Sequence, residues 1–225
     1  MYDADRSPWL DLYDYRLRVA TMFREHSASL RQGTSAMESL AQFRAARDEL
    51  FKMHPQSALA ETERATFTGL RYFPFEESAR VPAVLTPLPP SDPVSAPHSG
   101  SDAMPLNRAG KLTFTLHGEP LSLTVFWIDV YGGGLFVPFR DTTAPDETYG
   151  AGRYLVDTVK GALLEGFTPQ GTEIGFSGGH VMLDFNLAYN PSCAYNARWA
   201  CPLAPPENWL PVPVRAGELR YHDDA

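Results

Sequence analysis

The sequence has little lysine and no long apolar run. Only three lysines occur in 225 residues, so arginine supplies most of the positive charge, and the formal net charge is −8 at pH 7. No Lys/Arg cluster interrupts this acidic balance, and such a surface repels nucleic acid and anionic lipid. No segment approaches the roughly 20 apolar residues that a membrane helix needs. We therefore expect neither a nucleic-acid partner nor a membrane partner.

Signals for export and for metal binding are also missing. Residues 1–6 contain no basic n-region and no apolar h-region of a signal peptide, so we expect a cytoplasmic protein. Two cysteines, Cys193 and Cys201, are too few for a disulfide framework, and in a reducing compartment they would be free thiols. The six histidines are scattered, and the cysteines lack the close spacing of a zinc knuckle, so no metal site is expected.

Familiar catalytic motifs are missing as well. The chain has no Gly-x-Ser-x-Gly elbow, no His-Glu-x-x-His pair and no P-loop. The common hydrolase, metalloprotease and nucleotide-binding classes are therefore not indicated, and the sequence specifies no cofactor. It does not specify an oligomeric state either.

Two helices are predicted near the amino terminus. Ser7 and Pro8 are typical of an N-cap followed by proline at the first helical position. Ser35 and Glu38 have the spacing of a capping box, and Pro55 ends the second helix because proline disfavours helical backbone in the preceding residue. The expected apolar faces consist of Leu12, Tyr15, Val19, Met22 and Phe23 in the first helix, and Met37, Leu40, Ala41 and Phe51 in the second.

After the helices, the pattern becomes typical of β-structure. Residues 67–75 and 80–85 are short, aromatic or β-branched, and bounded by prolines. Residues 86–103 are rich in proline and serine and are interpreted as a long loop. The predicted organisation is a helical segment at 1–60, followed by a β-rich domain at 61–225 that contains this loop.

A β-hairpin is the clearest prediction. Apolar and polar residues alternate over 111–117 and again over 121–128, with a turn predicted at 118–120. Further strands are predicted at 135–139 and 181–187. The strands follow one another through turns without crossover helices, which favours antiparallel pairing. We therefore predict an α+β fold dominated by β-structure, with amino-terminal helices packed on an antiparallel β-sandwich or open barrel.

The carboxyl-terminal half contains several characteristic motifs. They are Leu-Phe-Val-Pro-Phe-Arg-Asp-Thr-Thr at 135–143, Glu-Thr-Tyr-Gly-Ala-Gly-Arg-Tyr-Leu at 147–155, Asp-Phe-Asn-Leu-Ala-Tyr-Asn-Pro at 184–191, Cys-Ala-Tyr at 193–195, Cys-Pro-Leu at 201–203, and the tail segments 206–208 and 210–218. In this order they resemble DUF1684, a bacterial and archaeal family of unknown function. The resemblance covers most of the chain from about His54 and supplies no substrate. The stretch between residues 155 and 184 is longer than the family pattern implies.

Polar residues near the end of the last predicted strand are candidates for a site. Asp184 and Asn186 are two positions apart, so a strand would present both on one face, opposite its apolar residues. Facing water they would simply be solvated, whereas in a cleft they would form a rigid clamp for a substrate. Tyr189 and Asn190 would follow at the strand end, where pockets often lie.

Arg153 is the candidate for anion binding. It is flanked by Tyr149 and Tyr154 in a stretch with few charges. An arginine in this setting either pairs with a buried carboxylate or presents its planar fork to an anionic ligand. Its candidate partners within the chain are Asp141, Glu147 and Asp184.

Cys193 is the candidate nucleophile. It requires a neighbouring base, for which His180 and His54 are candidates, whereas the ordinary alternative is an inert buried thiol. The seven residues between Cys193 and Cys201 also permit a switchable disulfide.

Two functional hypotheses follow from these residues. In the first, the protein is a small-molecule enzyme or ligand-binding protein with a polar pocket, anchored by arginine, for a small anionic ligand. Its expected catalytic residues are Asp184, Tyr189 and Cys193, and its expected ligand-binding residues are Arg153, Asn186, Asn190, Tyr149 and Glu147. In the second hypothesis, the protein is a non-catalytic interaction or structural domain, and these polar residues form a buried network.

Overall fold

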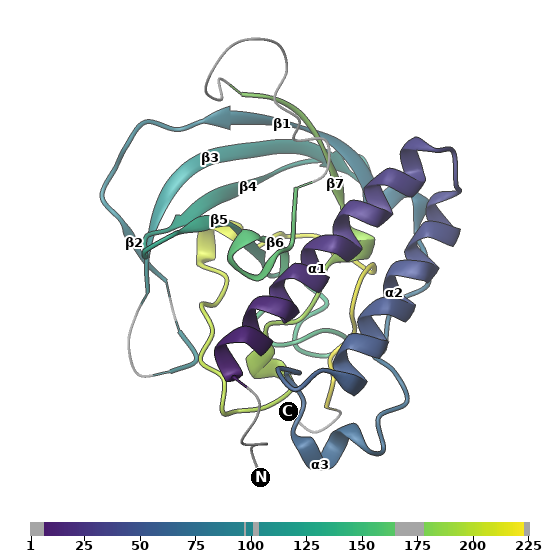
Figure 1. The fold of residues 1–225 in the computed structure, drawn as a ribbon. Coiled ribbons are helices and arrows are strands. Elements are labelled where there is room, and N and C mark those ends of the chain that lie inside the picture. The colour runs from purple at the N-terminus through teal and green to yellow at the C-terminus, as the bar shows by residue number, and fades with distance from the viewer. Residues whose placement is uncertain (1–6, 97, 101–103, 165–177, 223–225) are drawn as a thin grey trace.

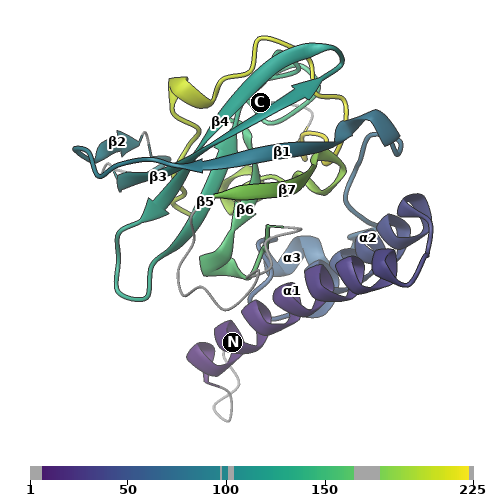
Figure 2. The same ribbon diagram turned by 90° about the horizontal axis from the view of Figure 1, so that it is seen from above.

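Two long helices lie along one side of a curled β-sheet (Figures 1 and 2). The computed structural model describes residues 7–96, 98–100, 104–164 and 178–222. Over these residues the helices are α1 (Pro8–Arg31), α2 (Ala36–Met53) and the short α3 (Glu61–Arg64). No helix in this part of the chain combines the length and apolar character that crossing a membrane requires.

The helix boundaries follow the predicted signals. Ser7 has extended backbone angles and Pro8 is the first helical residue of α1. The Ser35 hydroxyl accepts a hydrogen bond from the Glu38 N–H at 3.2 Å, so it satisfies one of the free donors at the start of α2. Helix α2 ends at Met53, just before Pro55. Both predicted helices are confirmed.

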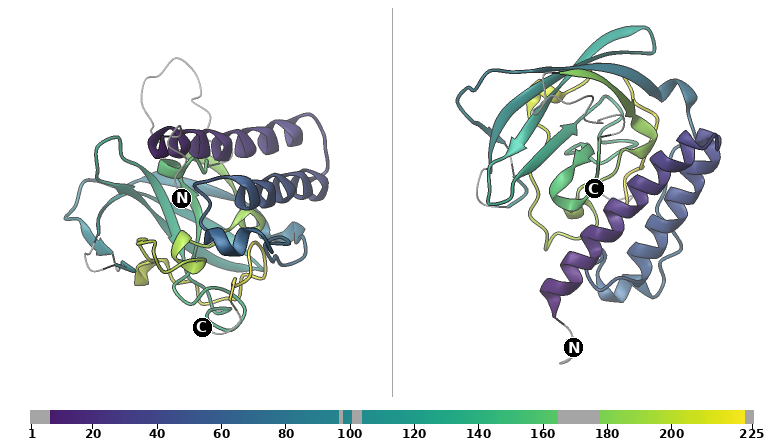
Figure 3. Two further views of the ribbon diagram at one scale, coloured as in Figure 1. Left: turned by 60° about the horizontal axis from the view of Figure 1, so that its bottom comes forward. Right: turned by 45° about the horizontal axis from the view of Figure 1, so that its top comes forward.

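Helices α1 and α2 pack side by side as an antiparallel pair (Figure 3). Their shared core also includes Ala162 and Leu187 from the carboxyl-terminal half of the chain. The buried apolar residues of this cluster are Val19, Met22, Phe23, Leu40, Phe43, Leu50, Ala162 and Leu187. Met37 and Ala41 are exposed, so the predicted face of α2 was wrong at these two positions, because the packed face runs through Leu40, Phe43 and Leu50.

The sheet is antiparallel throughout. Its strands are β1 (Arg80–Pro87), β2 (Val94–Ala96), β3 (Met104–Leu116), β4 (Glu119–Ile128), β5 (Gly134–Phe139), β6 (Arg153–Asp157) and β7 (Gly179–Asp184). Within the described ranges the order is β6-β5-β4-β3-β1-β7, and β2 pairs with β3. The sheet curls into a half-barrel (Figure 1). The predicted α+β fold is therefore confirmed, with an open barrel as its β-part.

The predicted hairpin is formed by β3 and β4. Its turn consists of His117 and Gly118, whose φ angles of 52° and 85° are both left-handed, as a two-residue type I′ turn requires. Glu119 and Pro120 already belong to β4, so the turn lies one residue earlier than predicted. A register shift between Arg108 and Gly110 interrupts the pairing near the start of β3.

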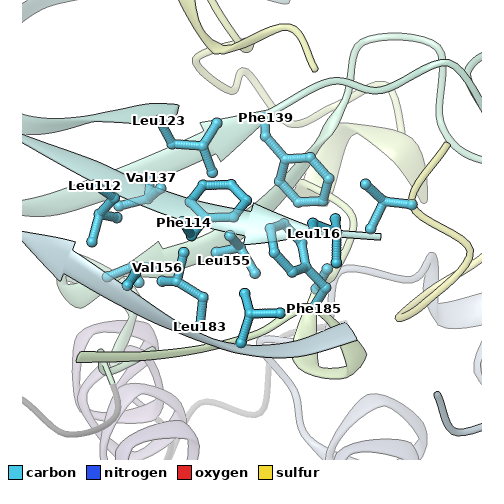
Figure 4. Packing of buried hydrophobic residues seen from close by; sticks show 14 of the residues in the cluster. Leu112, Phe114, Leu116, Leu123, Val137, Phe139, Leu155, Val156, Leu183 and Phe185 are labelled. Atoms are coloured by element: carbon cyan, nitrogen blue, oxygen red, sulfur yellow. The ribbon is translucent and has the colours of Figure 1, made fainter. Parts of the chain in front are cut away.

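The main apolar core lies inside the curl of the sheet (Figure 4). The predicted face of β3 supplies Leu112, Phe114 and Leu116, all of which are buried. A second cluster buries Phe126 and Ile128 with Leu106, Phe136 and Tyr154. Neighbouring residues of a strand point to opposite faces, so β4 places Leu123 and Val125 in the main core and Phe126 and Ile128 in the second cluster. Trp127, which the alternation places on the face of Leu123 and Val125, is 39% exposed.

Three further predictions about strands need correction. Residues 67–75 form no strand, and only Tyr72 makes a bridge, to Glu218. Strand β7 stops at Asp184, because the Asp184 side chain accepts a hydrogen bond from the Asn186 N–H and turns Phe185–Leu187 into a short 3₁₀ helix. The predicted loop at 86–103 contains strand β2, whose Ala96 is fully buried. The expected extra stretch before residue 184 lies largely at 165–177, outside the described residues.

Candidate functional site

Arg153, at the start of β6, forms a buried ion pair with Asp141. The Nη2 atom of Arg153 donates to Oδ2 of Asp141 at 2.9 Å, and both side chains are 1% exposed. The same guanidinium donates to the backbone carbonyls of Val214, Ala216 and Glu218. This is the pairing alternative that the sequence left open. It occupies both Nη atoms, and the remaining Nε donor is buried, so the guanidinium is not presented to a ligand. The geometry gives no support to Arg153 as a ligand anchor.

Asp184 and Asn186 belong to one hydrogen-bond network. Oδ1 of Asp184 accepts from both the backbone N–H and the side-chain amide of Asn186, at 2.9 Å each. The Asn186 amide also exchanges two hydrogen bonds with the backbone of Glu76, and Asp184 pairs with Arg80 at 3.3 Å. Both residues are buried. They therefore join the end of β7 to the start of β1, and they do not form the two-residue clamp of a strand face.

Glu218 is the centre of a second buried network. It accepts hydrogen bonds from Nε of Arg47 at 2.7 Å, from the backbone N–H of Asn190 at 2.8 Å and from the hydroxyl of Tyr195. The Asn190 amide donates to the carbonyl of Leu219 at 2.8 Å. Glu218 is 1% exposed. The network thus connects helix α2 to the carboxyl-terminal segment, and Asn190 is one of its structural members.

Two other predicted residues lie in different surroundings. Tyr189 pairs with Tyr154 through backbone hydrogen bonds, and burial raises the pKa of its phenol well above the ordinary value. Glu147 forms a surface ion pair with Arg215, with 2.9 Å between Oε1 and Nη2. Neither side chain is brought next to Arg153 or Asp184 by a contact within the described part of the chain.

Tyr149 and Cys193 are the predicted residues that share a pocket. Their hydroxyl oxygen and sulfur atoms are 3.6 Å apart. The pocket has a volume of about 550 Å³ and lies between the turn after β5, the start of α3, the 3₁₀ helix Ser192–Ala194 and the carboxyl-terminal segment. It is lined by Ala60, Glu63, Pro145, Thr148, Tyr149, Gly150, Ala151, Cys193, Ala194, Tyr195, Asn196, Ala197, Arg220, Tyr221 and His222.

The buried ion pair also holds the wall of this pocket. Oδ1 of Asp141 accepts hydrogen bonds from the backbone N–H and the hydroxyl of Thr143. The Thr143 hydroxyl in turn bonds to the Thr148 hydroxyl at 2.8 Å, directly before Tyr149. Arg153 and Asp141 therefore act on the pocket indirectly, by fixing the turn that carries Tyr149.

Cys201 is 2% exposed, whereas Cys193 is partly exposed. The Cys201 thiol and the Ser99 hydroxyl lie near the Cys193 sulfur, and the Tyr149 hydroxyl lies 3.6 Å from it. Together these groups lower the pKa of Cys193 to about 6 from an ordinary 9.0, although burial opposes the shift. The nearby Cys193 and burial raise the pKa of Cys201, and burial, followed by the bond to Cys193, raises that of Tyr149. Cys193 is thus the more acidic thiol of an adjacent pair.

The histidines proposed as bases lie elsewhere. Nε2 of His54 pairs with Asp14 at 3.1 Å, in a groove between α1 and α2. His180 lies on β7 opposite Val84 of β1 and lines a shallow hollow on the sheet. Neither is placed beside Cys193, so the predicted Cys–His pairing is not formed. Among the described residues, no group of three or more His, Cys, Asp or Glu side chains is arranged to hold a metal ion.

Sequence reasoning missed the polar residues of the pocket that come from the last described segment. Arg220 and His222 both line it. Nε2 of His222 lies 3.2 Å from the carbonyl oxygen of Tyr195, whereas the Arg220 guanidinium makes no ion pair or hydrogen bond with any residue in the described ranges. Arg220 lies beyond the motif tail at 210–218, and no local pattern marked it.

Comparison with known proteins agrees with the motifs. The DUF1684 family, described as a protein of unknown function, matches residues 65–219. An uncharacterized protein of Haloarcula marismortui, solved by solution NMR, is 33% identical, with a TM-score of 0.54; the match covers 81% of this chain and 92% of that one. No curated protein matches the chain. The family match covers more than half of the sequence and includes the motifs at 135–218. The protein therefore belongs to the DUF1684 family.

Proposed function

We propose that the protein is a small-molecule enzyme or a ligand-binding protein whose pocket takes a small anionic ligand beside Cys193. One observation carries this proposal. The partly exposed Cys193, its hydrogen-bond partner Tyr149 and Arg220, whose guanidinium bonds to no described residue, all line one pocket. A concave site with a few convergent polar groups and a perturbed pKa is typical of ligand-binding sites.

Cys193 has the properties of a nucleophile. With a pKa of about 6 its thiolate predominates at neutral pH, and the thiolate is the reactive form. The Tyr149 hydroxyl, 3.6 Å away, donates a hydrogen bond that stabilises the negative sulfur. In a covalent step the sulfur electron pair would form a bond to an electrophilic carbon of the ligand, and the displaced electron pair would leave with the leaving group.

Arg220 takes the part that the sequence suggested for Arg153. An arginine fork can bind a carboxylate or a phosphate through two parallel hydrogen bonds, provided that its donors are not already engaged. The pocket lining includes one carboxylate, that of Glu63, and this group accepts a hydrogen bond from the Ala60 N–H at 3.1 Å. An anion is therefore the ligand whose charge complements this wall.

The alternative is a non-catalytic interaction or structural domain. It is favoured by the burial and mutual bonding of Arg153, Asp184, Asn186 and Asn190, four of the residues that the sequence suggested for a site. For these four residues a structural role explains every contact described above. The two hypotheses differ at the pocket, where the first requires selective chemistry at Cys193 and the second requires none.

Paired alkylating reagents provide the test. Iodoacetate and iodoacetamide both form a bond between the thiol sulfur and their methylene carbon as iodide leaves, but only iodoacetate is anionic. We expect Cys193 to react before Cys201. We also expect the ratio of the iodoacetate rate to the iodoacetamide rate to exceed that of free cysteine by about tenfold, which corresponds to about 1.4 kcal/mol of anion binding.

The Arg220→Gln variant should return this ratio to that of free cysteine. Arg215→Gln is the matched control, because Arg215 is an exposed arginine that pairs with Glu147 and does not line the pocket. If the wild-type protein shows the ratio and the rates of free cysteine, the proposed site is wrong. A thermal-shift series with small carboxylates and phosphates would then distinguish weak binding from none, since a ligand at 100 times its Kd adds about 2.7 kcal/mol of stability.

A further inference from the structure

We propose that Cys193 and Cys201 form a redox modification site, at which a peroxide oxidises Cys193 and Cys201 then closes a disulfide bond with it. This inference rests on the proposed function in one respect, the nucleophilic thiol of Cys193. It goes beyond that function because it adds a second substrate class, hydrogen peroxide or an organic hydroperoxide, and a role for Cys201.

The first support is the position of the two thiols. Seven residues separate them in the sequence, and the fold brings them close enough for each thiol to be the main influence on the pKa of the other. Ser99 fixes the backbone of Cys201, because its hydroxyl accepts the Cys201 N–H at 2.7 Å and its N–H donates to the Cys201 carbonyl at 2.9 Å. The same serine also helps to lower the pKa of the Cys193 thiol, so it lies near both cysteines.

The second support is the difference between the two cysteines. Cys193 is partly exposed and lines the pocket, whereas Cys201 is buried and does not. A peroxide therefore reaches Cys193 first. The lowered pKa of Cys193 favours the thiolate, the form that attacks the O–O bond. This is the usual arrangement of a reactive cysteine with a resolving partner.

The chemistry balances in two steps. In the first, the Cys193 thiolate forms an S–O bond as the peroxide O–O bond breaks, so the sulfur is oxidised by two electrons and hydroxide or alkoxide leaves. In the second, the Cys201 sulfur attacks the Cys193 sulfur, the S–O bond breaks, and the departing hydroxide takes up the Cys201 proton to give water. Two thiols and one hydrogen peroxide yield one disulfide and two molecules of water, and an organic hydroperoxide yields one molecule of alcohol and one of water.

The first step also prepares the second. The Cys201 thiol keeps its proton partly because the Cys193 thiolate lies near it, and Cys193 is the first cause of the raised pKa of Cys201. When Cys193 becomes a neutral sulfenic acid, that cause is removed, and Cys201 ionises more readily. The disulfide would also remove the nucleophile from the pocket, so oxidation would switch the proposed site off.

The test uses the full chain, reduced and then titrated with hydrogen peroxide. We expect both thiols to be lost together, a mass decrease of two hydrogens, and a Cys193–Cys201 peptide in a non-reducing digest. The rate should not depend on protein concentration. The Cys201→Ser variant should instead accumulate a sulfenic acid that dimedone traps at Cys193, and Cys193→Ser should lose its remaining thiol at least about tenfold more slowly, as a buried thiol does.

Three results would overturn the inference. They are a sulfenic acid that persists in the wild type, a disulfide that forms only between chains, and loss of the Cys201 thiol at the wild-type rate in Cys193→Ser. The wild-type measurements test the inference without any variant. If Cys201→Ser melts early, Cys201→Ala takes its place. If Cys201→Ser keeps the iodoacetate preference but the wild type forms no disulfide, only this inference is wrong. If the wild type forms the disulfide but the iodoacetate preference is absent, only the proposed anionic ligand is wrong.

Discussion

The guanidinium of Arg153 lies 2.9 Å from the carboxylate of Asp141, and both side chains are buried. The second oxygen of this carboxylate accepts hydrogen bonds from Thr143 and from the backbone N–H of Val214 at 3.1 Å. The pair therefore connects strand β6, the turn before Tyr149 and the carboxyl-terminal segment. An arginine that joins three segments in this way should affect stability more than ligand binding.

We predict that Arg153→Lys lowers the free energy of unfolding by about 3 kcal/mol, measured by denaturant titration. Lysine keeps the charge but cannot reach Asp141 and three backbone carbonyls at once, so buried acceptors lose their donors. Arg215→Lys is the matched control and should cost less than about 1 kcal/mol, because its pair with Glu147 is exposed. A stable Arg153→Lys protein with lost anion binding would support the original anchor hypothesis.

We predict that Asp184→Ala and Phe185→Ala both destabilise the protein. Removing the Asp184 carboxylate breaks its bonds to Asn186 and its pair with Arg80, which should cost about 2–3 kcal/mol. Phe185 is fully buried in the main core, and truncating a buried phenylalanine costs about 3–5 kcal/mol. Thermal and denaturant unfolding measure both effects. An Asp184→Ala protein with unchanged stability and weakened ligand binding would instead support a functional role of Asp184 in a ligand site.

We predict that alkylation of Cys193 by iodoacetamide has its pH midpoint near 6. A lowered pKa means that the thiolate is already formed at lower pH, so at pH 7 about ten thiolates exist per thiol. Tyr149→Phe removes a donor to the thiolate, so its midpoint should move to higher pH and its rate at pH 6 should fall several-fold. Tyr131→Phe, at a fully exposed tyrosine, should change nothing. A wild-type midpoint above pH 8 would contradict the assignment of Cys193.

We predict that the proline-rich stretch 86–103 divides into two parts of different importance. Replacing residues 89–92, all exposed, with Gly and Ser should change the free energy of unfolding by less than about 1 kcal/mol. Ala96→Asp should cost about 3 kcal/mol or more, because it places a charge in the cluster around Phe126. Ser95→Asp, at the exposed neighbouring position, is the control. A loss above about 2 kcal/mol from the first replacement would show that the loop packs as structure.

Local patterns predicted a large part of the fold. The capping signals at Ser7 and Ser35 located both helices, and the alternation of Leu112, Phe114 and Leu116 located the central hairpin. These signals suffice because helix caps and strand faces depend on residues only a few positions apart. They failed where a side chain intervened, as at Asp184, which turns the backbone away from the predicted strand.

The order of motifs in the carboxyl-terminal half was enough to predict the family. The same motifs did not reveal which of their polar residues are structural. Asn190 and Arg153 lie in motif segments, yet one serves the Glu218 network and the other the pair with Asp141. Motif membership and chemical role are therefore separate questions here.

The sequence by itself thus determined the helices, the antiparallel hairpin, the family and the candidacy of Tyr149 and Cys193. Only the tertiary structure decided which polar residues are buried and which line a pocket. The deciding contacts join distant positions, such as Arg47 and Glu218, which are 171 residues apart. Neighbouring residues carry no signal of such contacts, because burial and the partner of each polar group are fixed only when the whole chain packs.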